Sequence, residues 1–145
     1  MLLLAKNSSL STTVHSQLSA SHTLTDIHII SLVGEAGLIT LNGIVEIASD
    51  IQKVSGHILE ENIFLGSTGQ IRGIPSLLVH SDDVHAGHAA RIERIPDEKL
   101  YYLRARGIPH DDATVMMIRS SVFGLFSGLD DTKKETIMSQ ILALI

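Results

Sequence analysis

The sequence contains no cysteine and no tryptophan among its 145 residues. Without cysteine, the chain cannot form a disulfide bond or supply a thiolate ligand to zinc or to an iron–sulfur cluster. It also lacks a Gly-rich phosphate loop after a predicted strand and a serine in a Gly-x-Ser-x-Gly motif. No motif therefore indicates catalysis, and we expect a protein that is not an enzyme.

Basic residues are scarce in the first half of the chain, where Lys6 and Lys53 are the only Lys or Arg side chains before Arg72. The formal net charge is −5. Nucleic-acid-binding proteins usually carry a basic face, so we do not expect a nucleic acid partner. No apolar run approaches the ~20 residues that span a bilayer, and the start of the chain does not resemble a secretory signal. We expect a cytoplasmic protein without a membrane partner.

Aromatic residues make up only 3% of the chain, and Phe64 is the only one in residues 1–71. Short aliphatic runs bounded by Gly, Asn, Asp or Ser predict short strands there. An antiparallel sandwich usually has aromatic side chains in its core, whereas a parallel β-solenoid can fill its narrow interior with Val, Ile, Leu and Ala. The composition favours the solenoid, but no clean repeat excludes the sandwich. The runs are residues 27–30, 38–41, 44–47, 63–65 and 77–79.

The pattern changes to that of helices at residue 96. Pro96 with two acidic residues after it predicts a helix start, and Gly107 predicts its C-terminal cap. A second helix is predicted from Pro109, with apolar residues around nearly its whole circumference as far as Leu129. A third is predicted from residue 130. We therefore expect a β core over residues 1–95 and a region of three helices over residues 96–145.

Three of the eight histidines lie between these regions, at His80, His85 and His88. On a helix, His85 and His88 would converge as a metal-binding pair, but the flanking Val79 and Val84 indicate a strand, on which they diverge. His88 then shares a face with small apolar residues. One interpretation is a buried, hydrogen-bonded structural histidine, with His80 and His85 at the surface.

Two segments carry a resemblance to a known family. Residues 82–90 (Asp-Asp-Val-His-Ala-Gly-His-Ala-Ala) and 97–108 (Asp-Glu-Lys-Leu-Tyr-Tyr-Leu-Arg-Ala-Arg-Gly-Ile) resemble, without gaps, conserved segments of the SufB/SufD family. These proteins are scaffolds of the SUF iron–sulfur cluster assembly system. Weaker similarity reaches back to residues 42–43, 52–53 and 62–65.

The resemblance implies a right-handed parallel β-helix followed by a helical C-terminal region. In the family two such β-helices associate, a cluster is thought to assemble at their interface, and the helical ends bind SufC, an ABC-type ATPase. His88 occupies the place of a SufD histidine that faces the interface, so the resemblance implies a metal role for it. The implied partner-binding side chains are Tyr101, Tyr102, Arg104, Arg106, Met116, Phe123 and Phe126.

The sequence departs from the family at informative places. SufB-type members have a cysteine where Glu60 lies and a glutamate where Ala89 lies, so the chain resembles SufD more than SufB. It is also shorter than typical members. We expect a SufD-like scaffold subunit that pairs with a SufB-like chain and binds a SufC-like ATPase. No cofactor is expected on this chain alone, but an iron–sulfur cluster is expected at the shared interface. The alternatives are a structural solenoid that pairs with itself and, more distantly, a β-helix enzyme acting on carbohydrate or acyl groups.

Overall fold

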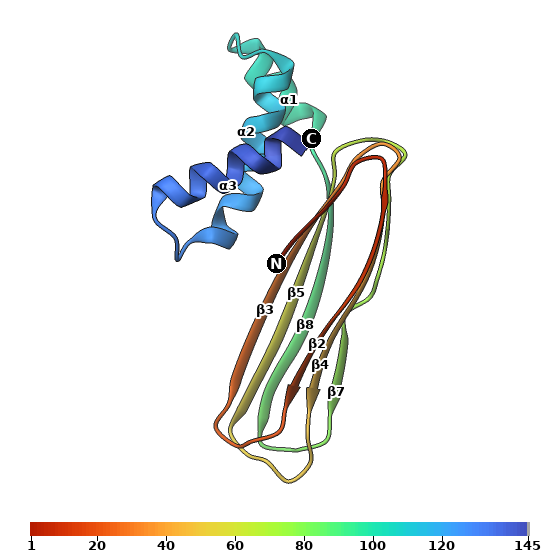
Figure 1. The fold of residues 1–145 in the computed structure, drawn as a ribbon, viewed down its shortest axis with the longest axis vertical. Coiled ribbons are helices and arrows are strands. Elements are labelled where there is room, and N and C mark those ends of the chain that lie inside the picture. The colour runs from red at the N-terminus through yellow and green to blue at the C-terminus, as the bar shows by residue number, and fades with distance from the viewer. Residues whose placement is uncertain (145) are drawn as a thin grey trace. The chain divides into compact units, whose positions relative to one another are not determined.

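The computed structural model describes residues 1–144 and divides the chain into two compact units, Met1–Glu93 and the residues from Arg94 onward. The first unit consists of strands and the second mainly of helices (Figure 1). Each unit is described by itself.

The strand unit contains two sheets whose pairings all run parallel. One sheet has the order β1-β3-β5-β8, formed by β1 (Leu2–Ala5), β3 (Leu24–Val33), β5 (Val54–Phe64) and β8 (Val84–Arg94). The other contains β2 (Ser9–Leu18), β4 (Leu38–Ile47), β6 (Gln70–Arg72) and β7 (Ser76–Val79). Both β6 and β7 pair with β4, so they lie one after the other along the same edge.

Successive turns of the chain alternate between the two sheets, which is the arrangement of a β-solenoid. In the register between neighbouring strands, Leu24 pairs with Ser55 and Val33 with Phe64. On the other sheet, Ser9 pairs with Leu38 and Leu18 with Ile47. The predicted parallel solenoid is confirmed, and the sandwich alternative is wrong because it requires antiparallel strands.

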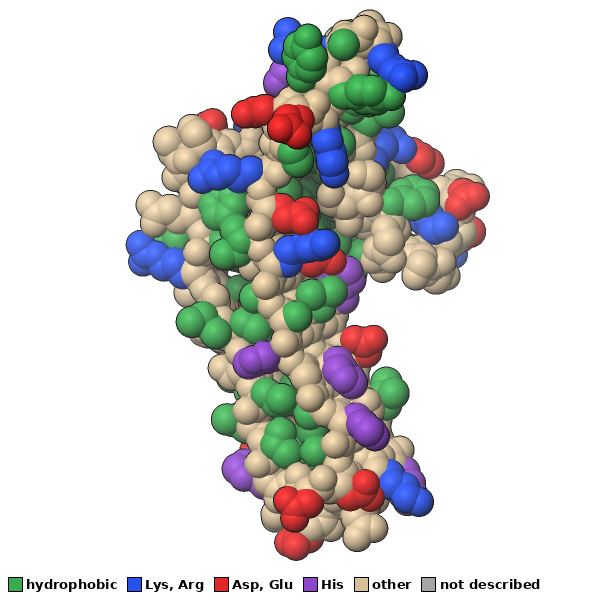
Figure 2. Space-filling view, turned by 180° about the vertical axis from the view of Figure 1, so that it is seen from behind, with side chains coloured by type: hydrophobic (Ala, Val, Ile, Leu, Met, Phe, Trp, Pro, Cys, Tyr) green, Lys and Arg blue, Asp and Glu red, His purple; other side chains and the backbone are tan. Residues whose placement is uncertain are grey.

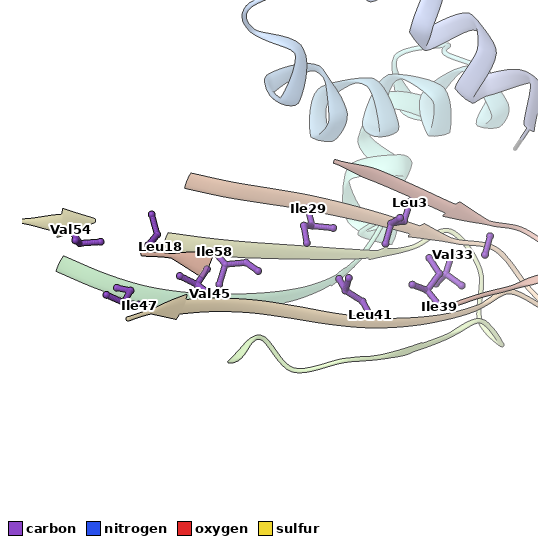
Figure 3. Packing of buried hydrophobic residues seen from close by; sticks show 11 residues of the cluster. Leu3, Leu18, Ile29, Val33, Ile39, Leu41, Val45, Ile47, Val54 and Ile58 are labelled. Atoms are coloured by element: carbon purple, nitrogen blue, oxygen red, sulfur yellow. The ribbon is translucent and has the colours of Figure 1, made fainter. Parts of the chain in front are cut away.

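The core of the strand unit lies between the two sheets (Figure 3). Alternate residues of each strand point inward, and nearly all are aliphatic, as in β4, where Ile39, Leu41, Val45 and Ile47 are fully buried. A narrow interior filled by these side chains leaves no need for large aromatic residues. The scarcity of aromatics noted in the sequence therefore follows from the thickness of the solenoid.

The second unit contains α1 (Asp97–Ala105), α2 (His110–Val122), a 3-10 helix (Phe123–Phe126) and α3 (Asp131–Leu144). Gly107 ends the first helix with a φ of +86°, a left-handed conformation that glycine adopts without strain, as predicted. The prediction that the second helix continues to residue 129 is wrong, because the α-helix ends at Val122 and tightens into the 3-10 turn. Asp130 begins α3 by accepting a hydrogen bond from the Lys133 backbone N–H at 3.0 Å.

Candidate functional site

The inner face of β5 carries an acidic residue in the middle of an otherwise mostly apolar row. Val54 and Ile58 point into the core, and Glu60 continues this inward alternation. Its side chain is only 1% exposed. In the part of the chain that the structure describes, neither carboxylate oxygen of Glu60 has a hydrogen-bond partner.

Gly43 of β4, on the opposite sheet, provides the space for this carboxyl group. A Cβ atom added to Gly43 would lie 2.4 Å from Glu60 Oε1 and 2.5 Å from Ile58 Cδ1. Contacts this short do not occur between real atoms, so any larger residue at position 43 would displace the carboxyl group. The Glu60 side chain therefore reaches across the interior of the solenoid and depends on a glycine there.

Two further polar residues lie on the same inner surface. Asn62 follows Glu60 two residues later on β5, and Ser31 is its register partner on β3. Both side chains are buried, and Ser31 Oγ and Asn62 Oδ1 also lack a hydrogen-bond partner among the described residues. Buried polar atoms are usually hydrogen-bonded, so this group of oxygen atoms is unusual for a protein core.

His88 lies on β8, the strand that follows β5 in the sheet order. Val84 and Ala86 of β8 pack against the core, so His88, two residues further, points to the same inner face. Its side chain is exposed because β8 is the last strand of this sheet. The interpretation of His88 as a buried structural histidine is therefore wrong. His80 and His85 are exposed.

Burial and the nearby histidine act on Glu60 in opposite directions. Desolvation by burial raises the pKa of the Glu60 carboxyl group above its ordinary value. Attraction to the positive charge of protonated His88 opposes this shift and lowers the pKa by a smaller amount. Glu60 and His88 therefore sense each other electrostatically, although they lie on different strands.

The outer face of the same sheet has a contrasting arrangement, in which each charged group has a partner. His28 Nε2 lies 2.7 Å from Glu61 Oε1, and Arg91 lies 3.6 Å from the other oxygen of Glu61. Arg91 also contacts Glu93 at 3.0 Å. Several histidine side chains are visible along one face of the strand unit in Figure 2. Glu61 thus differs from its neighbour Glu60 in both its orientation and its partners.

The helical unit carries the other side chains that the sequence predicts to be functional. No residue of α1 is buried, and Tyr101 is 74% exposed. Arg106 lies over the ring of Tyr102, 4.7 Å from its centroid. A cavity of about 300 Å³ between α1 and α2 is lined by Glu98, Lys99, Tyr102, Leu103 and Met117.

The remaining predicted partner-binding residues are distributed over the helices. Arg104 is exposed on α1 and Met116 is exposed on α2. Phe123, beneath the Lys134 ammonium group at 5.1 Å, and the half-buried Phe126 belong to the 3-10 turn. The structure brings Tyr102 and Arg106 together, but these residues do not all form one continuous site.

The described residues contain no group of three or more His, Asp or Glu side chains that could hold a metal ion. Within the same range, no helix is both long and apolar enough to cross a membrane. The most unusual chemical feature of the strand unit is therefore the unpartnered Glu60 with Asn62 and Ser31 beside it and His88 nearby.

Comparison with known proteins identifies the family of this chain. The family model described as "SUF system FeS cluster assembly, SufBD core domain" matches residues 1–121. The chain belongs to the SufBD family. The iron–sulfur cluster assembly protein SufD of Escherichia coli (strain K12) is 33% identical over 115 residues, which cover 79% of this chain and 26% of that protein.

Other SufBD relatives show the same partial coverage. A SufBD family protein of Archaeoglobus fulgidus is 29% identical over 109 residues, covering 75% of this chain and 29% of the relative. SufB of Bacillus subtilis (strain 168) is 25% identical over 88 residues, 61% of this chain and 19% of the relative. The chain thus spans only about a quarter of the curated relatives that it matches over the greatest length.

The sequence prediction missed three of the residues that make the inner site distinctive, Glu60 as a buried group, Gly43 and Asn62. A signal was present in the alternation of β5, in which the inward positions read Val54, Gly, Ile58, Glu60 and Asn62. A charged residue at an inward position of such a row is a candidate functional group. Only the strand register shows that a glycine of another sheet lies opposite it.

Proposed function

We propose that this chain is a SufD-like scaffold subunit in iron–sulfur cluster assembly and not an enzyme. It pairs with a SufB-like β-helix, binds a SufC-like ATPase through its helices, and acts in the cytoplasm. Support comes from its membership of the SufBD family, its 33% identity to SufD of E. coli and the absence of cysteine. Because the chain has no thiolate, sulfur ligands to a cluster must come from the partner.

The observation that carries this proposal is the position of His88 on the last strand of its sheet. The imidazole is exposed there, and the outer edge of β8 pairs with no other strand among the described residues. An exposed strand edge can pair with another chain, which would place a partner next to His88. A neutral imidazole at such an interface is a suitable ligand for iron.

The helical unit offers a surface suited to a protein partner. Tyr101, Tyr102 and Met116 are exposed large side chains, and a cavity lies beside Tyr102. Tyrosine, methionine and arginine are enriched at protein interfaces, where they anchor the partner in pockets. We therefore assign α1 and α2 as the docking surface for the ATPase subunit.

Co-purification of the chain with the SufB-like and SufC-like proteins of its own organism tests the proposal. We expect a complex of the three proteins, and loss of the SufC-like protein from it when Tyr102→Ala and Met116→Ala are combined. Gln140→Ala, an exposed residue of α3, is the control and should retain the complex. Failure of the folded wild-type chain to bind either protein would refute the proposal.

The second candidate is a structural solenoid that pairs with itself and takes no part in cluster chemistry. The open edge of β8 supports it, because two copies could pair there. Light scattering after size exclusion, together with iron and sulfide reconstitution, separates the two functions. A stable homodimer that takes up no iron, alone or with the SufB-like protein, would favour the structural solenoid.

A further inference from the structure

The buried carboxyl group of Glu60 has no structural explanation in the packing around it. An aliphatic side chain of similar size would fill the space without leaving an unpartnered charge in the core. Instead, the opposite sheet has a glycine at position 43, where a Cβ atom would collide with the carboxyl group. The sequence thus keeps both the acid and the room for it, although burying an unpaired polar group costs stability.

The atoms around Glu60 are mainly acceptors. Both oxygens of Glu60 and the Oδ1 atom of Asn62 are buried without a hydrogen-bond partner among the described residues. The positive charge of protonated His88 acts on Glu60, so the imidazole lies within electrostatic range on the same inner face. Oxygen atoms of a carboxylate and an amide, together with an imidazole nitrogen, favour a divalent ion of the first transition series over calcium or a soft ion.

We propose that Glu60 and His88 bind one divalent transition-metal ion of the Fe²⁺ class on the inner face of the last coils of the solenoid. Asn62 adds an oxygen ligand or orients the carboxylate. The remaining coordination positions stay open to water or to ligands of another protein, because this site supplies no thiolate. The proposal rests on the proposed function in treating the ion as cargo for cluster assembly, but ion binding itself can be measured on this chain alone.

Anaerobic titration with Co²⁺, a spectroscopic substitute for Fe²⁺, tests the site in the isolated full-length chain. We expect saturable binding of one ion per chain, visible as d–d absorption bands, and displacement of these bands by added Fe²⁺. Glu60→Gln is nearly isosteric and His88→Ala removes an exposed side chain, so both variants should fold, which circular dichroism checks. Each should weaken Co²⁺ binding by more than about tenfold, since losing a direct ligand costs at least as much as losing an outer-shell partner.

Two neighbouring residues provide matched controls. Glu61→Gln changes the next carboxylate on the same strand, which points to the outer face and contacts His28. His85→Ala changes a histidine of the same strand as His88 at an exposed position. Both controls should bind Co²⁺ within about twofold of the wild type. Equal loss in the Glu61→Gln variant would locate the ion on the outer face and overturn the proposal, as would the absence of saturable binding to the folded wild type.

The failure of this inference can be distinguished from the failure of the proposed function. If the wild type binds no Co²⁺ but still co-purifies with the SufB-like and SufC-like proteins, the ion site is wrong and the scaffold function stands. If Co²⁺ binds as expected but neither protein is captured, the ion site stands and the scaffold function is wrong.

Discussion

Replacing the buried carboxyl group of Glu60 by an amide should stabilise the protein at neutral and alkaline pH. The pKa of Glu60 is raised above its ordinary value of 4.5 by desolvation, so the folded state favours the neutral acid. The stability that the neutral acid contributes is fully present below the pKa of the unfolded chain, about 4.5. It is lost as the pH rises through the higher pKa of the folded state.

The magnitude follows from the surroundings of the side chain. Glu60 is 1% exposed and neither oxygen has a hydrogen-bond partner among the described residues, so the ionised form carries the desolvation penalty of an unsatisfied buried group. That penalty is about 1–3 kcal/mol, and attraction to His88 reduces it. We therefore expect Glu60→Gln to raise the free energy of unfolding of the strand unit by about 1–3 kcal/mol at pH 8. At pH 4 the gain should disappear.

Urea denaturation followed by circular dichroism, at pH 8 and pH 4 in the presence of a chelator, measures this difference. The chelator removes any contribution from a bound metal ion, which would stabilise the wild type alone. Glu61→Gln is the control, because Glu61 faces outward with His28 and Arg91 as partners and its loss removes favourable contacts. If Glu60→Gln were less stable than the wild type at pH 8, Glu60 would have native partners and the reasoning would fail.

Three further changes test the packing of the two units. Gly43→Ala should destabilise the strand unit by about 1–3 kcal/mol, because its Cβ atom overpacks the core; adding Glu60→Ala should restore part of this loss in a denaturation experiment, and an unchanged loss would contradict the contact. Ile118→Ala removes a buried side chain of α2 and should cost the helical unit about 2–5 kcal/mol, measured by its helical ellipticity on denaturation. Asp130 caps α3, and its backbone hydrogen bond with Lys133 lowers its pKa, so Asp130→Ala should increase amide exchange in the first turn of that helix. In the wild type the same exchange should increase only as the pH falls through the lowered pKa of Asp130, and pH-independent exchange there would argue against the cap.

The strands and helices were largely predictable because they follow local rules. Gly107 stops the first helix through its backbone conformation, and the small aliphatic runs specify strands of a narrow core. The prediction failed between Val122 and Leu129, where an apolar pattern of helical period continues but the backbone tightens into a 3-10 turn. The apolar period was compatible with both conformations, so it could not show where the α-helix ends.

The site was less predictable than the fold. The sequence indicated His88 through its resemblance to a family segment, and the strand pattern correctly separated it from His85. It gave Glu60 no structural role beyond its place in a comparison with related sequences. The burial of Glu60 depends on the sheet beside it and the sheet opposite, neither of which can be read from residues 54–64 alone.

By itself, the sequence determined that the core is built from small aliphatic side chains, that no thiolate is available, and that strands give way to helices near residue 95. These properties depend on composition and on interactions between residues close together in the chain. Only the tertiary structure decided that the carboxyl group of Glu60 lies over Gly43, unpartnered, within electrostatic range of His88. The physical reason is that the coils of a solenoid bring distant residues together through strand register, which no local pattern of residues encodes.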